Sequence, residues 1–310
     1  MTPLTMKHLR YFDALARHGH FGRAAEACSI SQPALSMQIK EMEEALGGGL
    51  LERSARQVTL TRLGEELIER VRDILRSVDE LGDFARASRD RFAGRLRIGM
   101  IPTVAPYLLP RVIGGLTRAH PELDIQVREA LTQKLIQELA EGRLDTAIVA
   151  LPVSEPSLTE VALFSEHFLL VRPVADQAKP VPSREMLREM RLLLLEEGHC
   201  FRDQALSFCK MHSSPRELLD ANSLSTLVQM VSAGVGVTLI PEMAVAVETR
   251  SAAVSVARFK NPQPSRTIGM VWRKTSPLAR QLNQIAEVVC LSAGKSRRKP
   301  AKPALRLQRP

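Results

Sequence analysis

The feature that most limits what this chain can fold into is a pair of helical patterns joined by a tight polar turn. Apolar residues recur at helical spacing over residues 9–28 and again over residues 34–46. Between them stands Ser31, a residue type that caps helices well, with Gln32 and Pro33 in the first turn of the second helix. Two helices meeting in this way predict a helix-turn-helix.

Two further elements are expected within the first 90 residues. Residues 51–61 alternate between apolar and polar after three consecutive glycines, which predicts a small β-ribbon, or wing. Residues 62–90 predict one long helix with a narrow apolar stripe, formed by Leu67, Val71, Ile74, Val78, Leu81 and Ala85. The narrowness of the stripe favours pairing with a second copy of the chain, and packing on its own domain is the alternative.

The remainder of the chain alternates strand-like and helix-like segments. Strands are expected at 96–101, 123–127, 146–151, 163–171, 192–195, 237–240 and 267–272, and helices at 108–116, 131–139 and 224–231. This alternation predicts an α/β domain, and its length accommodates two lobes with a cleft between them. The predicted boundaries are a winged helix-turn-helix at 4–61, a linker helix at 62–90, a two-lobed α/β domain at 91–294 and a tail at 295–310.

The net charge of +9 is mostly a property of the tail. Residues 295–310 carry seven Lys and Arg and no acid, so the charge by itself supports nucleic-acid binding weakly. We expect this tail to be disordered, and either inert or a source of salt-sensitive DNA affinity. The chain has no apolar run long enough for a membrane span and residues 1–8 lack the core of an export signal, which predicts a cytoplasmic protein.

Four motifs stand in order in the N-terminal part: FGRAAE at 21–26, SQPALS at 31–36, LER at 51–53 and TLT at 59–61, followed by Gly64. In this order they resemble the winged helix-turn-helix of LysR-type transcriptional regulators. The resemblance implies binding to double-stranded promoter DNA, a regulatory domain with the two-lobed, periplasmic-binding-protein-like fold, assembly as a dimer of dimers, and contact with RNA polymerase. The three consecutive glycines at 47–49 depart from that pattern.

Physical requirements single out the residues that would touch DNA. Small polar side chains at the start of the second helix suit base edges, and nearby basic side chains suit phosphates. The candidates are Ser31, Gln32, Pro33, Ser36, Gln38, Lys40, Arg53 and Arg56. We expect Gln32 and Ser36 to contact bases and Arg53 to contact phosphate or the minor groove. In the alternative, Ser31 only caps its helix and Arg53 is a solvated surface charge.

A second resemblance lies in the other half of the chain. GHCFRDQA at 198–205, followed by FC at 208–209, is similar to the redox loop of the OxyR-type, peroxide-sensing subfamily of LysR regulators, as are residues 101–110 and 266–269. It implies that hydrogen peroxide oxidises Cys200 to a sulfenic acid, that Cys209 then forms a disulfide with it, and that a thiol reductant such as glutaredoxin or thioredoxin reverses this. The implied supporting residues are Thr103, Thr132, His199, Arg202, Asp203 and Arg266. Residues 210–219 depart from the subfamily pattern.

The spacing of the two cysteines has a consequence of its own. Residues 201–209 have a helical pattern, and nine residues of helix rise about 13.5 Å, whereas a disulfide needs Cα atoms within about 7 Å. The two thiols therefore cannot bond while such a helix persists, and bonding would force a change of shape. His199, Arg202 and a helix start at about Arg202 are expected to lower the pKa of the Cys200 thiol.

Other interpretations stay open on the sequence alone. The cysteines could be small buried hydrophobes, as Cys28 and Cys290 are expected to be, in a regulator that binds a small organic effector in the cleft. A thiol peroxidase is disfavoured by the helix-turn-helix, so we expect no enzyme, and an exported solute-binding protein is disfavoured by the missing signal. Only His212 stands near ligand spacing, so neither a metal site nor a cofactor is expected.

Overall fold

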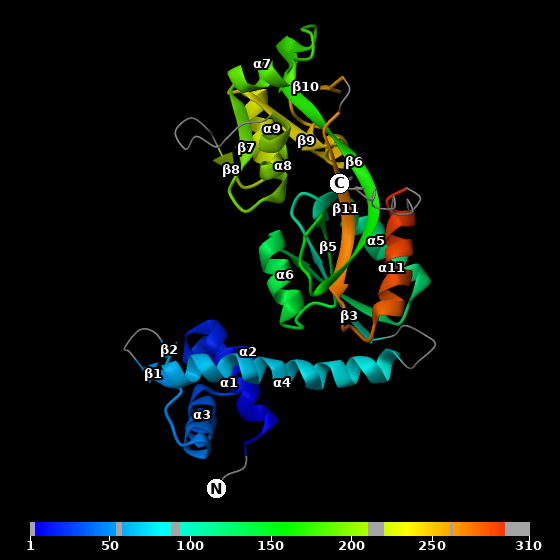
Figure 1. Ribbon diagram of the computed structural model, residues 1–310. Helices are drawn as coiled ribbons and strands as arrows, with labels where there is room; N and C mark the ends of the chain where they lie inside the picture. Colours follow the sequence, from blue (N-terminus) through cyan, green and yellow to red (C-terminus); the bar gives the residue numbers. More distant parts are fainter. Residues whose placement is uncertain (1–3, 54–57, 88–93, 210–219, 261–262, 295–310) are drawn as a thin grey trace, which may run out of the picture. The chain divides into compact units, whose positions relative to one another are not determined.

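The computed structural model describes residues 4–53, 58–87, 94–209, 220–260 and 263–294 (Figure 1). Its internal contacts divide the chain into two compact units, Met1–Ala85 and Arg86–Pro310. The basic tail at 295–310, the divergent segment at 210–219 and Arg56 lie outside the described residues. The domain boundaries expected from the sequence remain predictions.

The N-terminal unit contains the predicted helix-turn-helix. Its helices are α1 (Met6–His18), α2 (Phe21–Ala27) and α3 (Gln32–Leu46). The Ser31 hydroxyl accepts a hydrogen bond from the backbone N–H of Ala34, as expected of a helix cap. Gly47 ends α3 in the left-handed conformation, with φ of 73°. The apolar faces of the three helices share a buried core that includes Phe12, Leu15, Leu35, Ile39 and Met42.

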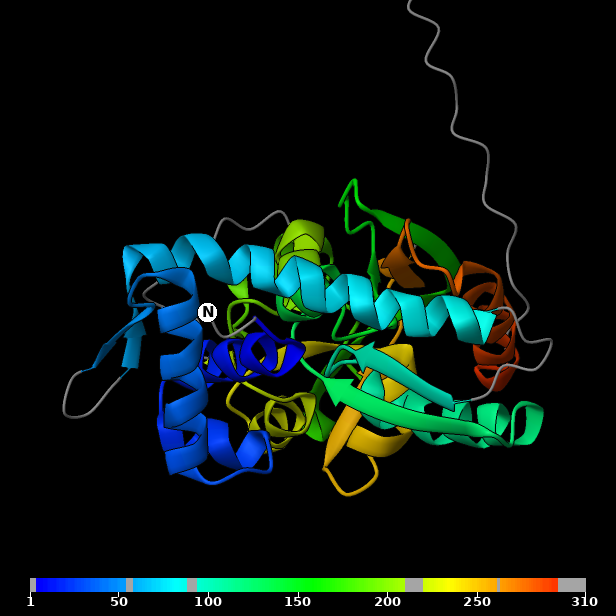
Figure 2. The same ribbon diagram turned by 90° about the horizontal axis from the view of Figure 1, so that it is seen from below.

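The wing and the long helix follow directly. Strands β1 (Leu51–Arg53) and β2 (Val58–Leu60) pair antiparallel, and α4 (Arg62–Ala87) begins two residues later. Gly64 makes this close approach possible, because a Cβ there would lie 2.2 Å from the carbonyl oxygen of Leu50. Helices α1 to α3 gather around the N-terminal end of α4, and the rest of the helix projects beyond them (Figures 1 and 2).

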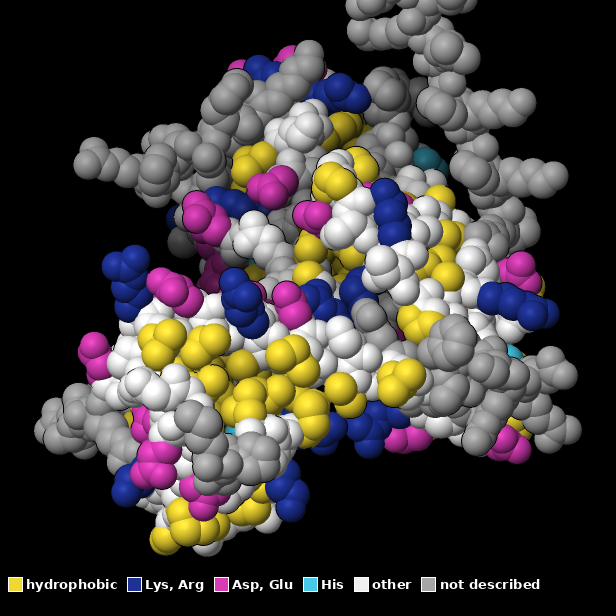
Figure 3. All heavy atoms as spheres, turned by 60° about the horizontal axis from the view of Figure 1, so that its bottom comes forward, with side chains coloured by type: hydrophobic (Ala, Val, Ile, Leu, Met, Phe, Trp, Pro, Cys, Tyr) yellow, Lys and Arg dark blue, Asp and Glu magenta, His cyan; other side chains and the backbone are white. Residues whose placement is uncertain are grey.

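The apolar stripe of α4 divides into two parts. Val71 is buried in the core of the N-terminal unit, so the first part packs on its own domain. Ile74, Val78 and Leu81 are 45%, 41% and 70% exposed. Hydrophobic side chains form a visible band on the surface of this unit (Figure 3). The first part of the stripe therefore packs in the core of the N-terminal unit, and the second part is an exposed apolar face.

The second unit is built on a mixed sheet. The strands are β3 (Gly94–Met100), β4 (Leu123–Glu129), β5 (Thr146–Leu151), β6 (Leu158–Pro173), β7 (Leu192–Leu195), β8 (Asp220–Ala221), β9 (Val237–Pro241), β10 (Val254–Ala257) and β11 (Ser265–Arg273). They are ordered β4-β3-β5-β11-β6-β9-β7-β8, with β10 paired to β6. Its helices are α5 (Ala105–Ala119), α6 (Thr132–Ala140), α7 (Arg184–Glu189), α8 (Cys200–Cys209), α9 (Leu224–Ser232), α10 (Val245–Glu248) and α11 (Ala279–Ser292), with short 3-10 turns η1 (Val174–Asp176) and η2 (Glu242–Ala244).

One strand links two lobes. The first part of β6 pairs with β11, and its last residues pair with β9 and β10 (Figure 1). Each lobe has its own buried core, one containing Trp272 and the other Phe168. In the first lobe, α5 and α11 cover one face of the sheet and α6 covers the other (Figure 1). The predicted two-lobed α/β architecture is confirmed, but the strand expected at 163–171 is longer because it serves both lobes.

Candidate functional site

Cys200 is the first residue of α8, and it lies where the two lobes meet. Helix α8 packs in the second lobe, yet the partly buried Cys200 side chain packs against the core of the first lobe. The turn before it depends on Gly198, which has φ of 92°. A Cβ on Gly198 would lie 3.1 Å from Leu131 Cδ1, so the turn also presses against the start of α6. The helix starts at Cys200 rather than at about Arg202, as the sequence had suggested.

Cys209 is the last residue of the same helix and has a different environment. Its side chain is fully buried in the core of the second lobe. Burial raises the pKa of the Cys209 thiol to about 11, although the charges of Arg188 and Arg184 partly oppose this. Both cysteines are free thiols. Because α8 is helical from one cysteine to the other, their Cα atoms stand about 13.5 Å apart, beyond the reach of a disulfide.

The two basic residues beside Cys200 differ in what they contribute. Burial lowers the pKa of His199, with a smaller opposing effect of Glu196, so the neutral imidazole is favoured. His199 therefore supplies polarity rather than the positive charge expected from the sequence. The buried Arg202 donates from Nη1 to the carbonyl oxygen of Leu195 at 2.6 Å and to Asp220 Oδ1 at 2.7 Å. These bonds tie the first turn of α8 to the ends of β7 and β8.

A buried ion pair holds one of the two predicted threonines. The Arg266 guanidinium donates to Glu166 Oε1 at 2.8 Å, and both side chains are almost fully buried. The same guanidinium donates to Thr103 Oγ1 at 2.8 Å and to the Thr103 carbonyl oxygen at 3.0 Å. Because Thr103 Oγ1 accepts from Arg266, its own proton is available to another acceptor. The backbone N–H of Met243 donates to the other Glu166 oxygen, which brings the second lobe into this network.

Thr132 supplies an unpaired polar group. It opens α6, one residue after the Leu131 side chain that the turn at Gly198 approaches. Among the described residues, its buried Oγ1 has no hydrogen-bond partner. A buried hydroxyl left unpaired is unfavourable unless something else bonds to it. The start of α6 with Thr132 thus lies against the turn that leads to Cys200, and Thr103 is held separately by Arg266.

Asp203 stands three residues after Cys200 in α8 and borders a separate hollow. It is exposed, and it lines a shallow pocket with Phe168, Gln204, Ser207, Phe208, Pro264 and Ser265. The structure places it in that pocket, so it does not share the contacts of Thr103 and Arg266.

Sequence reasoning missed two groups that connect the lobes. One is Glu166, which lies in the polar stretch Ser165–His167 of β6 and has no motif around it that marks it as a partner of Arg266. The other is Glu248, which accepts from Tyr107 at 2.6 Å and from Ser225 at 2.5 Å. Tyr107 belongs to the first lobe and packs against the core of the second. Burial is the main reason that the pKa of Tyr107 is raised.

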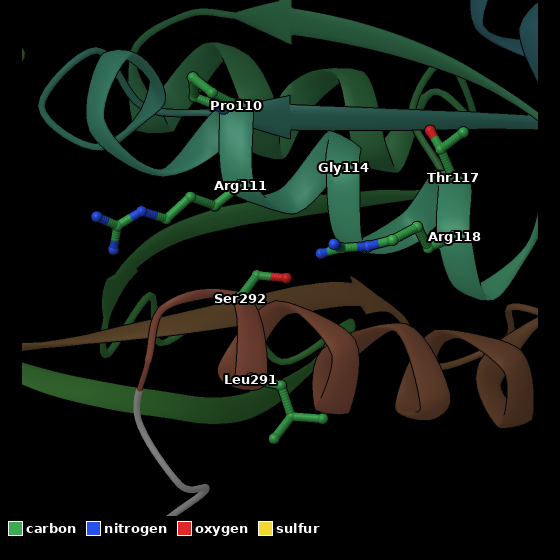
Figure 4. Close-up of a pocket in the computed structure, with 7 residues that line it drawn as sticks. All are labelled: Pro110, Arg111, Gly114, Thr117, Arg118, Leu291 and Ser292. Atoms are coloured by element: carbon green, nitrogen blue, oxygen red, sulfur yellow. The ribbon is translucent and has the colours of Figure 1, made fainter.

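A further hollow lies between α5 and α11, away from these residues. It is lined by Pro110, Arg111, Gly114, Thr117, Arg118, Leu291 and Ser292 (Figure 4). Arginine side chains and hydroxyls are its only polar side chains, so its lining offers no general base to activate a hydroxyl. Within the described ranges, no group of three or more His, Cys, Asp or Glu could hold a metal ion. None of the helices described there combines the length and apolarity of a membrane span.

The predicted DNA-contacting residues lie mainly on α3. Ser31, Gln32 and Pro33 are exposed at the start of the helix. Ser36 is partly exposed one turn later, and Lys40 is exposed one turn after Ser36. Gln38 donates to Glu41 at 2.8 Å, and Lys40 lies 3.6 Å from Glu44. Arg53 belongs to β1, and its side chain lies outside the described part. The sequence missed Met37, an apolar side chain 57% exposed on the same helix.

Comparison with known protein families gives two matches that together cover most of the chain. Residues 6–65 match the bacterial regulatory helix-turn-helix of the lysR family, and residues 89–289 match the LysR substrate binding domain. A Streptomyces viridosporus protein named as a probable hydrogen peroxide-inducible genes activator is 44% identical, covering 91% of this chain and 92% of the relative. The Escherichia coli DNA-binding transcriptional dual regulator OxyR is 42% identical, covering 92% of this chain and 95% of that protein.

Solved structures give the same grouping. A full-length OxyR variant from Pseudomonas aeruginosa aligns with a TM-score of 0.76 at 34% identity, covering 98% of this chain and all of that chain. A hydrogen peroxide-bound OxyR variant from Corynebacterium glutamicum aligns with a TM-score of 0.65 at 33% identity, covering 94% of this chain and 92% of the other. By sequence, by fold and by the arrangement of its lobes, this chain belongs to the LysR family of DNA-binding transcriptional regulators, within its OxyR-type group.

Proposed function

We propose that this chain is a transcription regulator that senses hydrogen peroxide through Cys200 and Cys209 and controls antioxidant genes. The observation that carries the proposal is the position of the two thiols at opposite ends of α8, one against each lobe. The names of the relatives, hydrogen peroxide-inducible genes activators, support the same signal. The chain would use peroxide as a signal and not turn it over as an enzyme does.

The first chemical step takes place at Cys200. Its thiolate sulfur attacks one peroxide oxygen, the O–O bond breaks, and the leaving hydroxide takes up a proton to become water. The product is a Cys200 sulfenic acid. The hydroxyls of Thr103 and Thr132 are the donors that would hold the peroxide, because Arg266 leaves the Thr103 proton free and Thr132 has no described partner. The neutral His199 imidazole would add a further polar contact.

The second step joins the two cysteines. Cys209 sulfur bonds to the Cys200 sulfur, the S–O bond of the sulfenic acid breaks, and the thiol proton leaves with the hydroxide as water. Closure requires that α8 unwinds, since the helix keeps the two residues too far apart. Because the ends of α8 pack on different lobes, unwinding changes contacts on both. A cellular dithiol such as glutaredoxin or thioredoxin would reverse the reaction by exchange.

The output is control of promoters in the cytoplasm. Gln32 and Ser36 of α3 would contact base edges, Lys40 would contact phosphate, and Arg53 would act from the wing. The exposed part of the α4 stripe would pair with a second copy, and two dimers would assemble on DNA. To activate transcription, the DNA-bound chain would contact RNA polymerase. The basic tail, if it takes part, would add salt-sensitive affinity.

The deciding experiment treats the reduced chain with one equivalent of hydrogen peroxide and traps its thiols at timed intervals for mass spectrometry. We expect a two-dalton loss located in a Cys200–Cys209 cross-link, and Cys209→Ser should stop at the Cys200 sulfenic acid. Free thiols at both positions, or equal oxidation of all four cysteines, would contradict the proposal. A Cys200→Ser variant that still responded to a small molecule would then favour the organic effector.

The DNA-binding residues need a separate test. Duplexes are first selected from a random library by the wild-type chain, so that no operator has to be assumed. Gln32→Ala and Ser36→Ala should each weaken binding to the selected duplex by about 1–3 kcal/mol and leave binding to unselected DNA unchanged. Lys40→Ala should weaken binding to both and lower the salt dependence. Equal losses on both duplexes for Gln32→Ala would remove its role in reading bases.

A further inference from the structure

Two arginines of the short helix α7 contact the C-terminal end of α8. Arg188 Nε donates to the Cys209 carbonyl oxygen at 2.8 Å. The Arg184 guanidinium lies over the ring of Phe208, 4.6 Å from its centroid. The two arginines stand four residues apart, so they share one face of α7. Neither contact takes part in the peroxide chemistry described above.

The Arg188 contact stabilises a helix end that α8 does not stabilise by itself. The last carbonyl oxygens of a helix have no donors within the helix, and the helix dipole makes that end negative. The last turn of α8 contains no basic residue of its own. Arg188 therefore supplies, from a neighbouring helix, a positive donor to an end whose described last turn has none. The arginine contacts depend on α8 keeping its helical form up to Cys209.

The two ends of α8 are held with different strength. At the start, Arg202 is buried and makes two short bonds, to the Leu195 carbonyl oxygen and to Asp220. At the end, Arg188 is exposed and its bond to Cys209 is only partly buried, and water weakens a charged contact of this kind. The polar contacts at the C-terminal end of α8 are therefore the ones lost at the lower cost, while the burial of Cys209 opposes its release. Disulfide closure would release that turn.

We propose that Arg188, assisted by Arg184, clamps the C-terminal turn of α8 in the reduced state and so sets the midpoint potential of the Cys200–Cys209 couple and the rate of its closure. This inference rests on the proposed function. The clamp favours the dithiol, because its contacts are made only while α8 is helical at Cys209. A stabilised reduced form makes the couple easier to reduce and its potential less negative.

The test measures the potential of the full-length chain in dithiol–disulfide buffers at pH 7, with the cross-linked fraction read by mass spectrometry. Arg188→Ala should shift the equilibrium about three- to tenfold toward the disulfide, which is about 15–30 mV more negative. Arg188→Lys should restore most of the wild-type value, because lysine keeps the charge and a donor. Arg191→Ala removes an exposed arginine beside α7 and serves as the matched control, with no shift expected.

Kinetics give a second reading of the same variants. After peroxide, formation of the Cys200 sulfenic acid should keep its wild-type rate in Arg188→Ala, while closure to the disulfide becomes about three- to tenfold faster. If Arg188→Ala fails to fold, Arg184→Ala is expected to change both values in the same direction by about two- to threefold.

The failures can be told apart. A wild-type chain that never forms the cross-link would remove the proposed function and the clamp with it. A normal wild-type cross-link, together with an unmoved potential in Arg188→Ala or an equal shift in Arg191→Ala, would overturn the clamp alone. Slower closure in Arg188→Ala would also overturn it, since that result would assign Arg188 to the charge state of Cys209.

Discussion

At the scale of single residues, the most informative atom is the Thr132 hydroxyl oxygen. Folded proteins pair nearly all of their buried polar groups, and each exception needs an explanation. The Thr132 hydroxyl is buried without a partner among the described residues, next to the segment that carries Cys200. A ligand that accepts or donates one hydrogen bond would satisfy it. Hydrogen peroxide, which does both, fits that requirement.

The variant Thr132→Val tests this idea. It keeps the side-chain shape and removes the hydroxyl, so sulfenic acid formation at Cys200 should slow by about ten- to hundredfold. The free energy of unfolding should stay the same or rise slightly, because no described hydrogen bond is lost. Sulfenic acid trapping and thermal unfolding measure the two quantities. Thr132→Ser is the matched control and should retain most of the rate; a full rate in Thr132→Val would exclude the hydroxyl from the site.

The burial of the Cys209 thiol predicts how the stability of the reduced chain changes at alkaline pH. Its folded pKa is about 11, above its ordinary value of 9.0, so between these values the unfolded chain loses a proton that the folded chain keeps. Stability due to this group is therefore complete below pH 9 and is lost as the pH rises toward 11, by up to about 2–3 kcal/mol. The free energy of unfolding of the reduced chain should therefore fall less steeply with pH over this range in Cys209→Ala than in the wild type. Parallel curves for the two proteins would contradict the burial of the thiol.

At the scale of elements, α4 exposes apolar side chains and α8 keeps two cysteines apart, and both features are unexpected for a chain acting alone. Part of the α4 stripe faces outward, although large apolar side chains favour burial. Helix α8 keeps apart the thiols of Cys200 and Cys209, which the proposed disulfide would join. On the proposed function, a partner helix would cover the exposed part of the α4 stripe, and oxidation would unwind α8.

Leu81→Asp tests the partner helix. Leu81 is 70% exposed, so the change should leave the stability of one chain nearly unaltered. Burial of a charge in an apolar helix pair is unfavourable, so the dissociation constant of the dimer should rise by tenfold or more. Sedimentation velocity over a concentration series measures this. Glu65→Ala, at an exposed polar position of the same helix, should leave the dimer intact, and an unchanged dimer in Leu81→Asp would exclude the stripe.

At the scale of the whole second unit, a buried ion pair belongs to a hydrogen-bond network that joins the two lobes. Glu166 and Arg266 bridge neighbouring strands β6 and β11, Arg266 holds Thr103 of the first lobe, and Glu166 accepts from the Met243 N–H of the second. The Tyr107–Glu248 hydrogen bond is a second link between the lobes. Movement of α8 would therefore act on lobes that are already connected by polar contacts.

Glu166→Gln measures how much this link contributes. It leaves the buried Arg266 charge without its carboxylate, which should lower the free energy of unfolding by about 3 kcal/mol or more. The chain has one tryptophan, Trp272, buried in the first lobe, so its fluorescence during urea unfolding reports this unit. Glu129→Gln makes the same change at an exposed site of β4 in the first lobe and should cost less than about 0.5 kcal/mol. Equal effects would mean that the buried pair adds little.

The sequence by itself determined what depends on neighbours along the chain. The Ser31 cap, the end of α3 at Gly47, the helix of residues 201–209 and the separation of its cysteines all follow from short-range rules of helix formation. The ordered motifs of the N-terminal part and of residues 198–209 also sufficed to place the chain in its family. These features needed no knowledge of how distant segments pack.

Only the tertiary structure decided which distant groups meet. Glu166 and Arg266 are separated by 100 positions, and nothing local to either identifies the other. The same is true of the unpaired Thr132 hydroxyl, the neutral His199, and the Arg188 bond to the Cys209 carbonyl oxygen. Burial and hydrogen bonding between segments are set by the whole packed domain, because a polar group removed from water must find its partner wherever the fold brings one.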